Sequence, residues 1–255
     1  MYAMRQRFAG LPLISHVVRA ALSPKQRAGA SARTAATRHE LTSRAESAGR
    51  FVVVLSQGRA GSTLILRMLN ACPGVRICGE NNRAFDHLKH FVECYRGARK
   101  NHTSDFYKLA WMLPCEETVV LSRLRELAVG LYNPDGAHSM FGFKEIRYGQ
   151  NGDLESDLAF LRQLFPGLRV IFNVRRTEDC VKSLWWAADP EGSAKTLETM
   201  RASFREHYDR HREDCYWMPF EELRRGSAVL QGMFDFLDTP MTPLAAAELD
   251  VRMRE

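Results

Sequence analysis

The stretch FVVVLSQGRAGSTLILRMLN, Phe51 to Asn70, decides the fold. Its first residues, Phe51–Leu55, are all apolar and predict a buried strand, and apolar residues then recur at helical spacing from Ser62 to Ala71. A glycine-rich turn, Gly58–Thr63, joins the two. Strand, glycine-rich turn and helix in this order form a cradle for a phosphate, because glycines let backbone N–H groups face an anion and the helix N-terminus adds partial positive charge.

The rest of the chain repeats the alternation of short apolar runs and helical periodicity. Strands separated by helices predict a parallel sheet. We therefore expect an α/β protein with a P-loop-type three-layer fold, in which helices cover both faces of a central parallel sheet. The further predicted elements are strands at Val75–Cys78, Met140–Tyr148 and Leu168–Val174, a mostly helical stretch Thr103–Tyr132 broken at Pro114, a helix capped by Asp153, and a helix capped by Thr177.

Charge divides the 255 residues into a tail and a domain. Residues 1–50 hold nine Lys/Arg and two acids, so they carry +7, whereas the whole chain carries +6. We expect residues 1–50 to be a basic, flexible tail, 51–240 the folded domain and 241–255 a C-terminal helical tail. The basic segment fits either a flexible arm that contains a short amphipathic helix or an organelle transit peptide. Because the domain itself is not basic, we expect no nucleic-acid partner.

Composition is that of an ordinary soluble protein, with 45% hydrophobic and 26% charged residues. No run approaches the ~20 apolar residues that span a bilayer. We expect a cytoplasmic enzyme, with organelle targeting as the alternative and peripheral contact through the basic tail. The six cysteines form no C-x-x-C pair and predict buried free thiols rather than disulfides. The eight histidines form no H-E-x-x-H motif, so we assign no metal.

The phosphate loop departs from the nucleotide-binding Walker pattern, which ends in Gly-Lys-Ser/Thr. Ser62 stands where the lysine would be, and the cation is Arg59. The strand Leu168–Val174 ends near Asn173 rather than at a magnesium-binding Asp. This combination favours an anion that is handled without Mg²⁺.

A second motif follows that strand: Arg175, and Ser183 eight residues later. An arginine at a strand end and a serine on the next helix can converge on one phosphate, because the guanidinium supplies forked charged donors and the hydroxyl a third contact.

Together the two motifs resemble the signatures of the sulfotransferases that use 3′-phosphoadenosine 5′-phosphosulfate (PAPS). Arg59-Ala60-Gly61-Ser62-Thr63 is similar to the family's 5′-phosphosulfate loop, with Ala60 for the usual Ser, and Arg175 and Ser183 match its 3′-phosphate motif. The segments CGENN, GFKEIRYG and SLWW add similarity to bacterial members, and MPFEEL places Phe220 where the family has Tyr. The resemblance covers roughly Phe51 to Asp238 and lies nearest to the bacterial and carbohydrate-type enzymes.

The resemblance implies a P-loop sulfotransferase that moves the sulfuryl group of PAPS to a hydroxyl or amine of a glycan, glycolipid or small metabolite, without a metal. It implies cofactor contacts from Arg59, Ala60, Gly61, Ser62, Thr63, Arg175 and Ser183. Glu80 is the expected general base and Glu145 the runner-up, because carbohydrate-type members use a carboxylate in this region. Arg59 and Lys144 are expected to stabilise the charge that develops during transfer. Ile146 stands near the place of the cytosolic class's catalytic His.

Other interpretations stay open at this level. A P-loop kinase or another phosphotransferase is one alternative, and the missing Walker lysine and magnesium carboxylate speak against it. A nucleotide-binding protein without turnover, which uses the basic tail as an interaction arm, is another. Trp185 and Trp186 are expected to pack in the core rather than to form a platform for a base.

Overall fold

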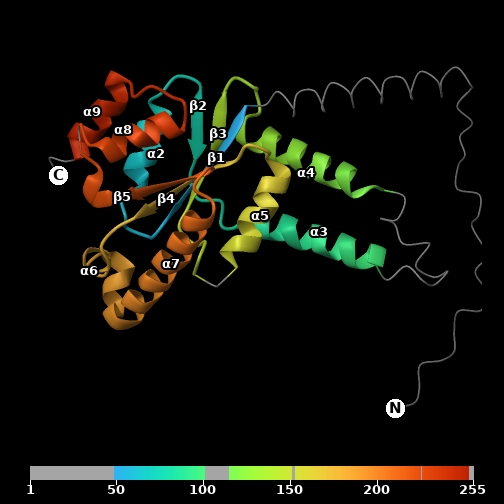
Figure 1. Ribbon diagram of the computed structural model, residues 1–255, viewed down its shortest axis with the longest axis horizontal. Coiled ribbons are helices and arrows are strands. Elements are labelled where there is room, and N and C mark those ends of the chain that lie inside the picture. The colour runs from blue at the N-terminus through green and yellow to red at the C-terminus, as the bar shows by residue number, and fades with distance from the viewer. Residues whose placement is uncertain (1–48, 101–114, 151–152, 225, 253–255) are drawn as a thin grey trace, which may run out of the picture. The chain divides into compact units, whose positions relative to one another are not determined.

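Five parallel strands form the centre of the protein, in the order β2-β3-β1-β4-β5 (Figure 1). The computed structural model describes residues 49–100, 115–150, 153–224 and 226–252. All of these ranges fall in one compact unit, Thr42–Glu255. The strands are β1 (Arg50–Ser56), β2 (Val75–Cys78), β3 (Met140–Glu145), β4 (Arg169–Val174) and β5 (Cys215–Pro219).

The stretch that opens the sequence supplies the middle strand. β1 pairs with β3 on one side and with β4 on the other, and residues 51–56 are all buried. Successive side chains of a strand point to opposite faces, so a middle strand that is covered on both faces needs apolar residues at every position. This is why the run FVVVL is continuous rather than alternating.

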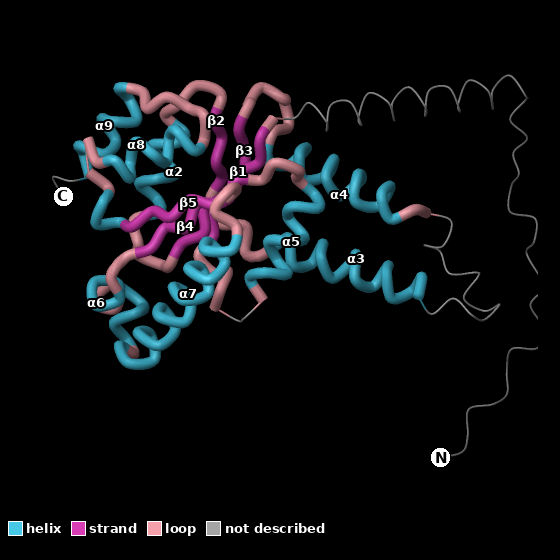
Figure 2. Tube along the Cα trace, viewed as in Figure 1, coloured by secondary structure: helices cyan, strands magenta, loops and turns pink. Residues whose placement is uncertain are grey.

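Helices cover both faces of the sheet. The helices α3, α4, α5 and α7 cover one face and α2, α8 and α9 the other (Figure 2). Phe51, Val53 and Leu55 belong to the buried cluster on the first face, and Val52 and Val54 to the cluster on the second. The predicted three-layer α/β architecture is therefore confirmed. The helices are α2 (Ser62–Asn70), α3 (Ala84–Lys100), α4 (Glu117–Tyr132), α5 (Leu154–Leu164), α6 (Thr177–Cys180), α7 (Pro190–Arg210), α8 (Ala228–Phe236) and α9 (Pro243–Arg252), with the 3₁₀ turns η2 (Leu184–Ala188) and η3 (Phe220–Glu222).

Two predicted details were wrong and one was confirmed. β3 ends at Glu145 instead of Tyr148, because the Glu145 carboxylate accepts a hydrogen bond from the N–H of Ile146 at 2.9 Å and the chain turns away there. α6 has Arg176, not Thr177, at its N-cap. Asp153 caps α5 as predicted, since its side chain accepts from the N–H of Ser156 at 3.2 Å.

The two ends of the chain differ in what the structure describes. Residues 1–48 lie outside the described residues, as do 101–114 with the predicted break at Pro114. The C-terminal helix α9 places Ala245 and Leu249 in the same buried cluster as α2.

No helix in the described ranges is long and apolar enough to cross a bilayer. All six cysteines are free, and Cys72, Cys180 and Cys215 are buried.

Candidate active site

The glycine-rich turn bends tightly between β1 and α2. Gly61, the N-cap of α2, has φ 81°, a left-handed conformation that glycine adopts at little cost. A Cβ on Gly61 would lie 2.3 Å from the Phe220 ring, so only glycine fits. Arg59 is also left-handed, with φ 71°, which is uncommon for a residue with a side chain. No side chain caps α2, so the N–H groups of its first turn are left for an anion.

Gln57 fixes the turn to two other elements. It is fully buried, and its Nε2 donates to the carbonyl of Leu197 on α7 at 2.6 Å. Its Oε1 accepts from the N–H of Arg175, just past β4, at 3.1 Å. A buried amide that is satisfied at both ends holds the start of the loop and the start of the second motif in one arrangement.

The two sequence motifs meet at Arg59. Its Nε donates to Ser183 Oγ at 2.8 Å, and its carbonyl accepts from Arg175 Nη1 at 3.3 Å. The Arg175 guanidinium lies over the Phe220 ring, 4.5 Å from its centroid. Two segments more than 110 residues apart thus adjoin at one cationic surface.

A cavity of about 380 Å³ opens beside the turn, at the carboxyl edge of the sheet. Four of its lining residues are cationic and one, Glu80, is acidic, so the cavity suits an anionic ligand. The lining residues are Arg59, Gly61, Ser62, Thr63, Leu64, Arg67, Glu80, Lys144, Ile146, Arg175, Trp185 and Phe220.

Glu80 and Lys144 form an ion pair on the cavity wall. Lys144 Nζ lies 2.6 Å from Glu80 Oε1, and Arg147 Nη1 lies 3.7 Å from Oε2. The Lys144 side chain is only 10% exposed, and a lysine that is buried this deeply needs such a partner. The Glu80 side chain keeps 32% of its surface exposed, so its carboxylate is accessible from the cavity.

Glu145, the alternative candidate for the base, lies in a different environment. It is fully buried. Its two oxygens accept from the backbone N–H groups of Ile146 and Arg83, at 2.9 and 3.2 Å, and Arg147 Nη1 approaches within 3.2 Å. Because Arg83 lies in the β2–α3 connection, Glu145 ties the segment that carries Glu80 to the end of β3. Its carboxylate accepts hydrogen bonds from backbone N–H groups and does not line the cavity.

The tryptophans depart from the expectation of core packing. Trp185 is 52% exposed and lines the cavity. Trp186 is partly buried, and its Nε1 donates to the carbonyl of Gly58 at 3.0 Å. Neither ring belongs to the two buried clusters, because η2 runs along the phosphate loop rather than under a sheet face.

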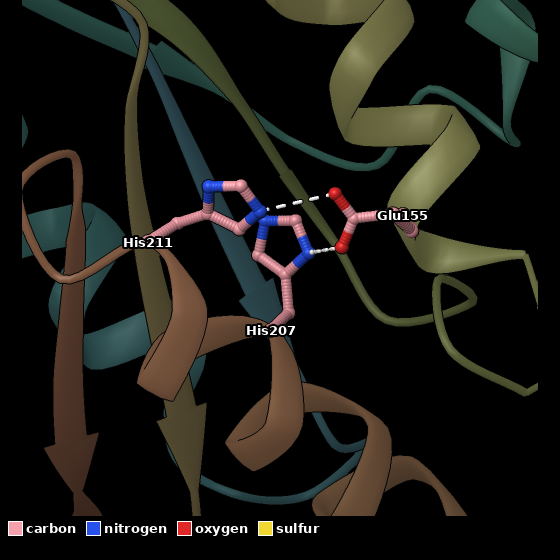
Figure 3. A group of neighbouring side chains, drawn as sticks. All are labelled: Glu155, His207 and His211. Atoms are coloured by element: carbon pink, nitrogen blue, oxygen red, sulfur yellow. Dashed lines mark hydrogen bonds and ion pairs between the residues drawn. The ribbon is translucent and has the colours of Figure 1, made fainter.

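A second polar cluster, formed by Glu155, His207 and His211, is absent from the cavity lining (Figure 3). Glu155 accepts from His207 Nδ1 at 2.9 Å and from His211 Nε2 at 3.0 Å. Arg162 Nη2 donates to His207 Nε2 at 3.0 Å, which puts the His207 proton on Nδ1. Both nitrogens of His207 are then used in hydrogen bonds. Burial lowers the pKa of His207 to about 4, and we interpret the cluster as a hydrogen-bonded network.

Most of the predicted site residues gather in the cavity. Two of them do not line it: Ala60 is buried, and Ser183 stands behind Arg59, whose guanidinium it binds. The sequence did not point to three further residues near the site, Gln57, Leu64 and Arg67. The signal for Gln57 is that a polar residue directly follows a buried strand. The position of Arg67, three residues before Asn70 on α2, gives no signal that its side chain reaches the cavity. Those that line the cavity are Arg59, Gly61, Ser62, Thr63, Glu80, Lys144 and Arg175.

Comparison with known proteins identifies the family. A model of the sulfotransferase family matches residues 52–243. Solved structures with similarity include the sulfotransferase domain of the olefin synthase of Synechococcus PCC 7002, with 18% identity over 77% of this chain and 76% of that one and a TM-score of 0.49. A sulfotransferase from Alicyclobacillus acidocaldarius has 13% identity over 80% and 95%, with a TM-score of 0.42. Sulfotransferase STF9 from Mycobacterium avium has 15% over 81% and 68%, with a TM-score of 0.39. No curated protein matches in sequence.

Because the family match covers the sheet, the phosphate loop and the Arg175 motif, the chain belongs to the sulfotransferase family.

Proposed function

We propose that this protein transfers the sulfuryl group of PAPS to a hydroxyl or amine of an acceptor. One observation carries the proposal: Arg59 joins the two motifs, because its side chain binds Ser183 and its carbonyl accepts from Arg175. PAPS has two separated anionic groups, the 5′-phosphosulfate and the 3′-phosphate. Arg59 and Arg175 offer one cation to each group. The loop N–H groups and Arg59 would hold the first, and Arg175 the second.

The residues present fit this co-substrate. Arg175 Nε is buried and has no hydrogen-bond partner among the described residues, so the guanidinium has a donor to spare for a phosphate. Gly61 leaves the room that the close approach of backbone to an anion requires. Trp185 and Phe220 add aromatic surface to the cavity, where an adenine ring could stack.

The reaction needs a proton acceptor and charge stabilisation. A bond forms between the acceptor oxygen or nitrogen and sulfur, and the bond from sulfur to the 5′-phosphate oxygen breaks. Glu80 takes the acceptor's proton. Lys144 keeps the Glu80 carboxylate in place through their 2.6 Å contact and would supply positive charge to the sulfuryl group. Arg59 stabilises the leaving 5′-phosphate.

Binding of 3′-phosphoadenosine 5′-phosphate (PAP) tests the proposal. PAP at ~100 times its dissociation constant should stabilise the fold by about 2.7 kcal/mol without any metal. Radiolabelled PAPS incubated with acceptor fractions should then yield a sulfated product. If Mg-ATP stabilises the protein and PAP does not, the kinase alternative is favoured. Binding of PAP with no labelled product would instead favour a nucleotide-binding protein without turnover.

We propose a glycan, glycolipid or small metabolite as the acceptor. We also propose a cytoplasmic localisation, with peripheral contact through the basic residues 1–50. The labelling experiment addresses the acceptor directly, because the labelled product can be purified and identified by mass spectrometry.

A further inference from the structure

Arg67 is a cation of the cavity wall that has no part in the proposed transfer. Its side chain is exposed and lines the cavity. No hydrogen bond or ion pair within the described ranges engages its guanidinium. By contrast, Lys144 is paired with Glu80, and Arg59 is bound to Ser183. Arg67 is therefore a cavity cation with its full set of donors available.

The fold places Arg67 on the side of the cavity that holds Glu80, the proposed base. Asn70, one turn later on the same side of α2, exchanges hydrogen bonds of 2.9 and 2.7 Å with the backbone of Ile77 on β2. That side of α2 therefore faces β2, and Glu80 lies two residues past the end of β2. Arg175 follows β4, on the other side of β1. Arg67 is thus on the side of the proposed base, away from the group assigned to the 3′-phosphate.

We propose that Arg67 binds an anionic group, a carboxylate or phosphate, on the acceptor itself. This rests on the proposed function and narrows the acceptor to a hydroxyl or amine compound that carries such a group. A guanidinium presents paired donors that match the oxygens of either anion. Leu64 and Ile146, which also line the cavity, supply apolar surface for the body of the acceptor.

Arg67 also has a structural interpretation, because a cation in the last turn of a helix interacts favourably with the helix dipole. That role predicts a change in stability on substitution and no change in ligand preference. The test therefore measures binding of matched ligands to PAP-saturated protein, which requires no turnover. The probes are 4-hydroxyphenylacetate, its amide and 4-hydroxybenzylphosphonate.

For the wild-type protein, one or both anions should bind more tightly than the amide, and the two anions show which group is preferred. Arg67→Gln should weaken binding of the anion by about tenfold to a hundredfold, the range for a lost charge-assisted hydrogen bond, and leave the amide unchanged. Arg67→Lys should restore part of the preference. Arg76→Gln, which removes the same charge on β2 outside the cavity lining, is the matched control and should behave as wild type.

PAP affinity distinguishes a failure of this inference from a failure of the proposed function. Arg67→Gln should bind PAP as wild type does. If it weakens PAP binding to the extent that Arg175→Gln does, Arg67 belongs to the nucleotide site and the inference is overturned. If wild-type protein binds PAP but no anion is preferred over the amide, the inference fails while the proposed function stands. If wild-type protein does not bind PAP at all, the proposed function fails, and the inference with it.

Discussion

Arg59 Nε donates to Ser183 Oγ at 2.8 Å, and this bond joins the phosphate loop to the motif that follows β4. The two residues are 124 positions apart, so the contact exists only because β1 and β4 are neighbours in the sheet. Ser183 is absent from the cavity lining, and its hydroxyl accepts from the Arg59 guanidinium, which does line the cavity.

Arg175→Ala should weaken PAP binding by about 2–3 kcal/mol, because it removes charge-assisted contacts to the 3′-phosphate. Adenosine 5′-phosphosulfate, which lacks that phosphate, should bind variant and wild type alike. Arg176→Ala, a change at the exposed neighbour, serves as the control and should leave both affinities intact. Calorimetric titration measures all of them. An equal loss for both ligands would show that Arg175 acts on the loop through the Arg59 carbonyl instead.

Glu80→Gln should lower turnover by roughly 10²–10⁴-fold, since it keeps the shape of the side chain and removes the proton acceptor. PAP affinity should be nearly unchanged. Glu145→Gln is the comparison, and its effect should be on stability, because the buried carboxylate holds the N–H groups of Arg83 and Ile146. Steady-state kinetics and thermal unfolding of both variants check this. The roles are reversed if Glu145→Gln abolishes turnover at wild-type stability while Glu80→Gln remains active.

Gln57→Leu should destabilise the fold by about 1–3 kcal/mol, because the Arg175 N–H and the Leu197 carbonyl both lose a buried partner. Urea unfolding measures the loss. PAP affinity should fall as well, since the loop and Arg175 are no longer held together. A Gln57→Leu variant with wild-type stability and wild-type PAP affinity would show that the amide bridge does not position the site.

His207 should make stability depend on pH below neutrality. Its pKa is about 4 in the folded protein, whereas the ordinary value, which applies to the unfolded chain, is 6.5. Between these pH values the unfolded chain binds a proton that the folded chain does not. Stability should therefore fall as the pH drops from 6.5 towards 4, by on the order of 3 kcal/mol in total.

His207→Gln tests this dependence, since an amide can accept from Arg162 and donate to Glu155 without titrating. Urea unfolding between pH 4 and 6.5 should show a flatter pH dependence for this variant than for wild type. His90→Gln, at a side chain that is 77% exposed, is the control and should retain the wild-type slope. Equal slopes for His207→Gln and wild type would contradict the assignment.

Much of the fold follows from local sequence patterns. A continuous apolar run predicts a strand that is buried on both faces, and a glycine-rich turn before a helix predicts an anion cradle, because these signals depend on residues that are adjacent in the chain. The same holds for Arg175, which follows a strand whose end must lie at the carboxyl edge of a parallel sheet. Family resemblance also points to Glu80 and Lys144, and both line the cavity.

The sequence could not decide which side chains contact one another or which backbone groups they bind. Glu145 and Glu80 are both carboxylates near strand ends, and only packing buries the first against backbone N–H groups and exposes the second to the cavity. Residue type predicts a core position for Trp185, yet η2 lies along the phosphate loop and leaves the ring exposed. Glu155 and His207 are 52 residues apart and meet only because α5 and α7 pack on one face of the sheet. Such contacts depend on the register between helices and sheet, which is a property of the whole core rather than of any local pattern.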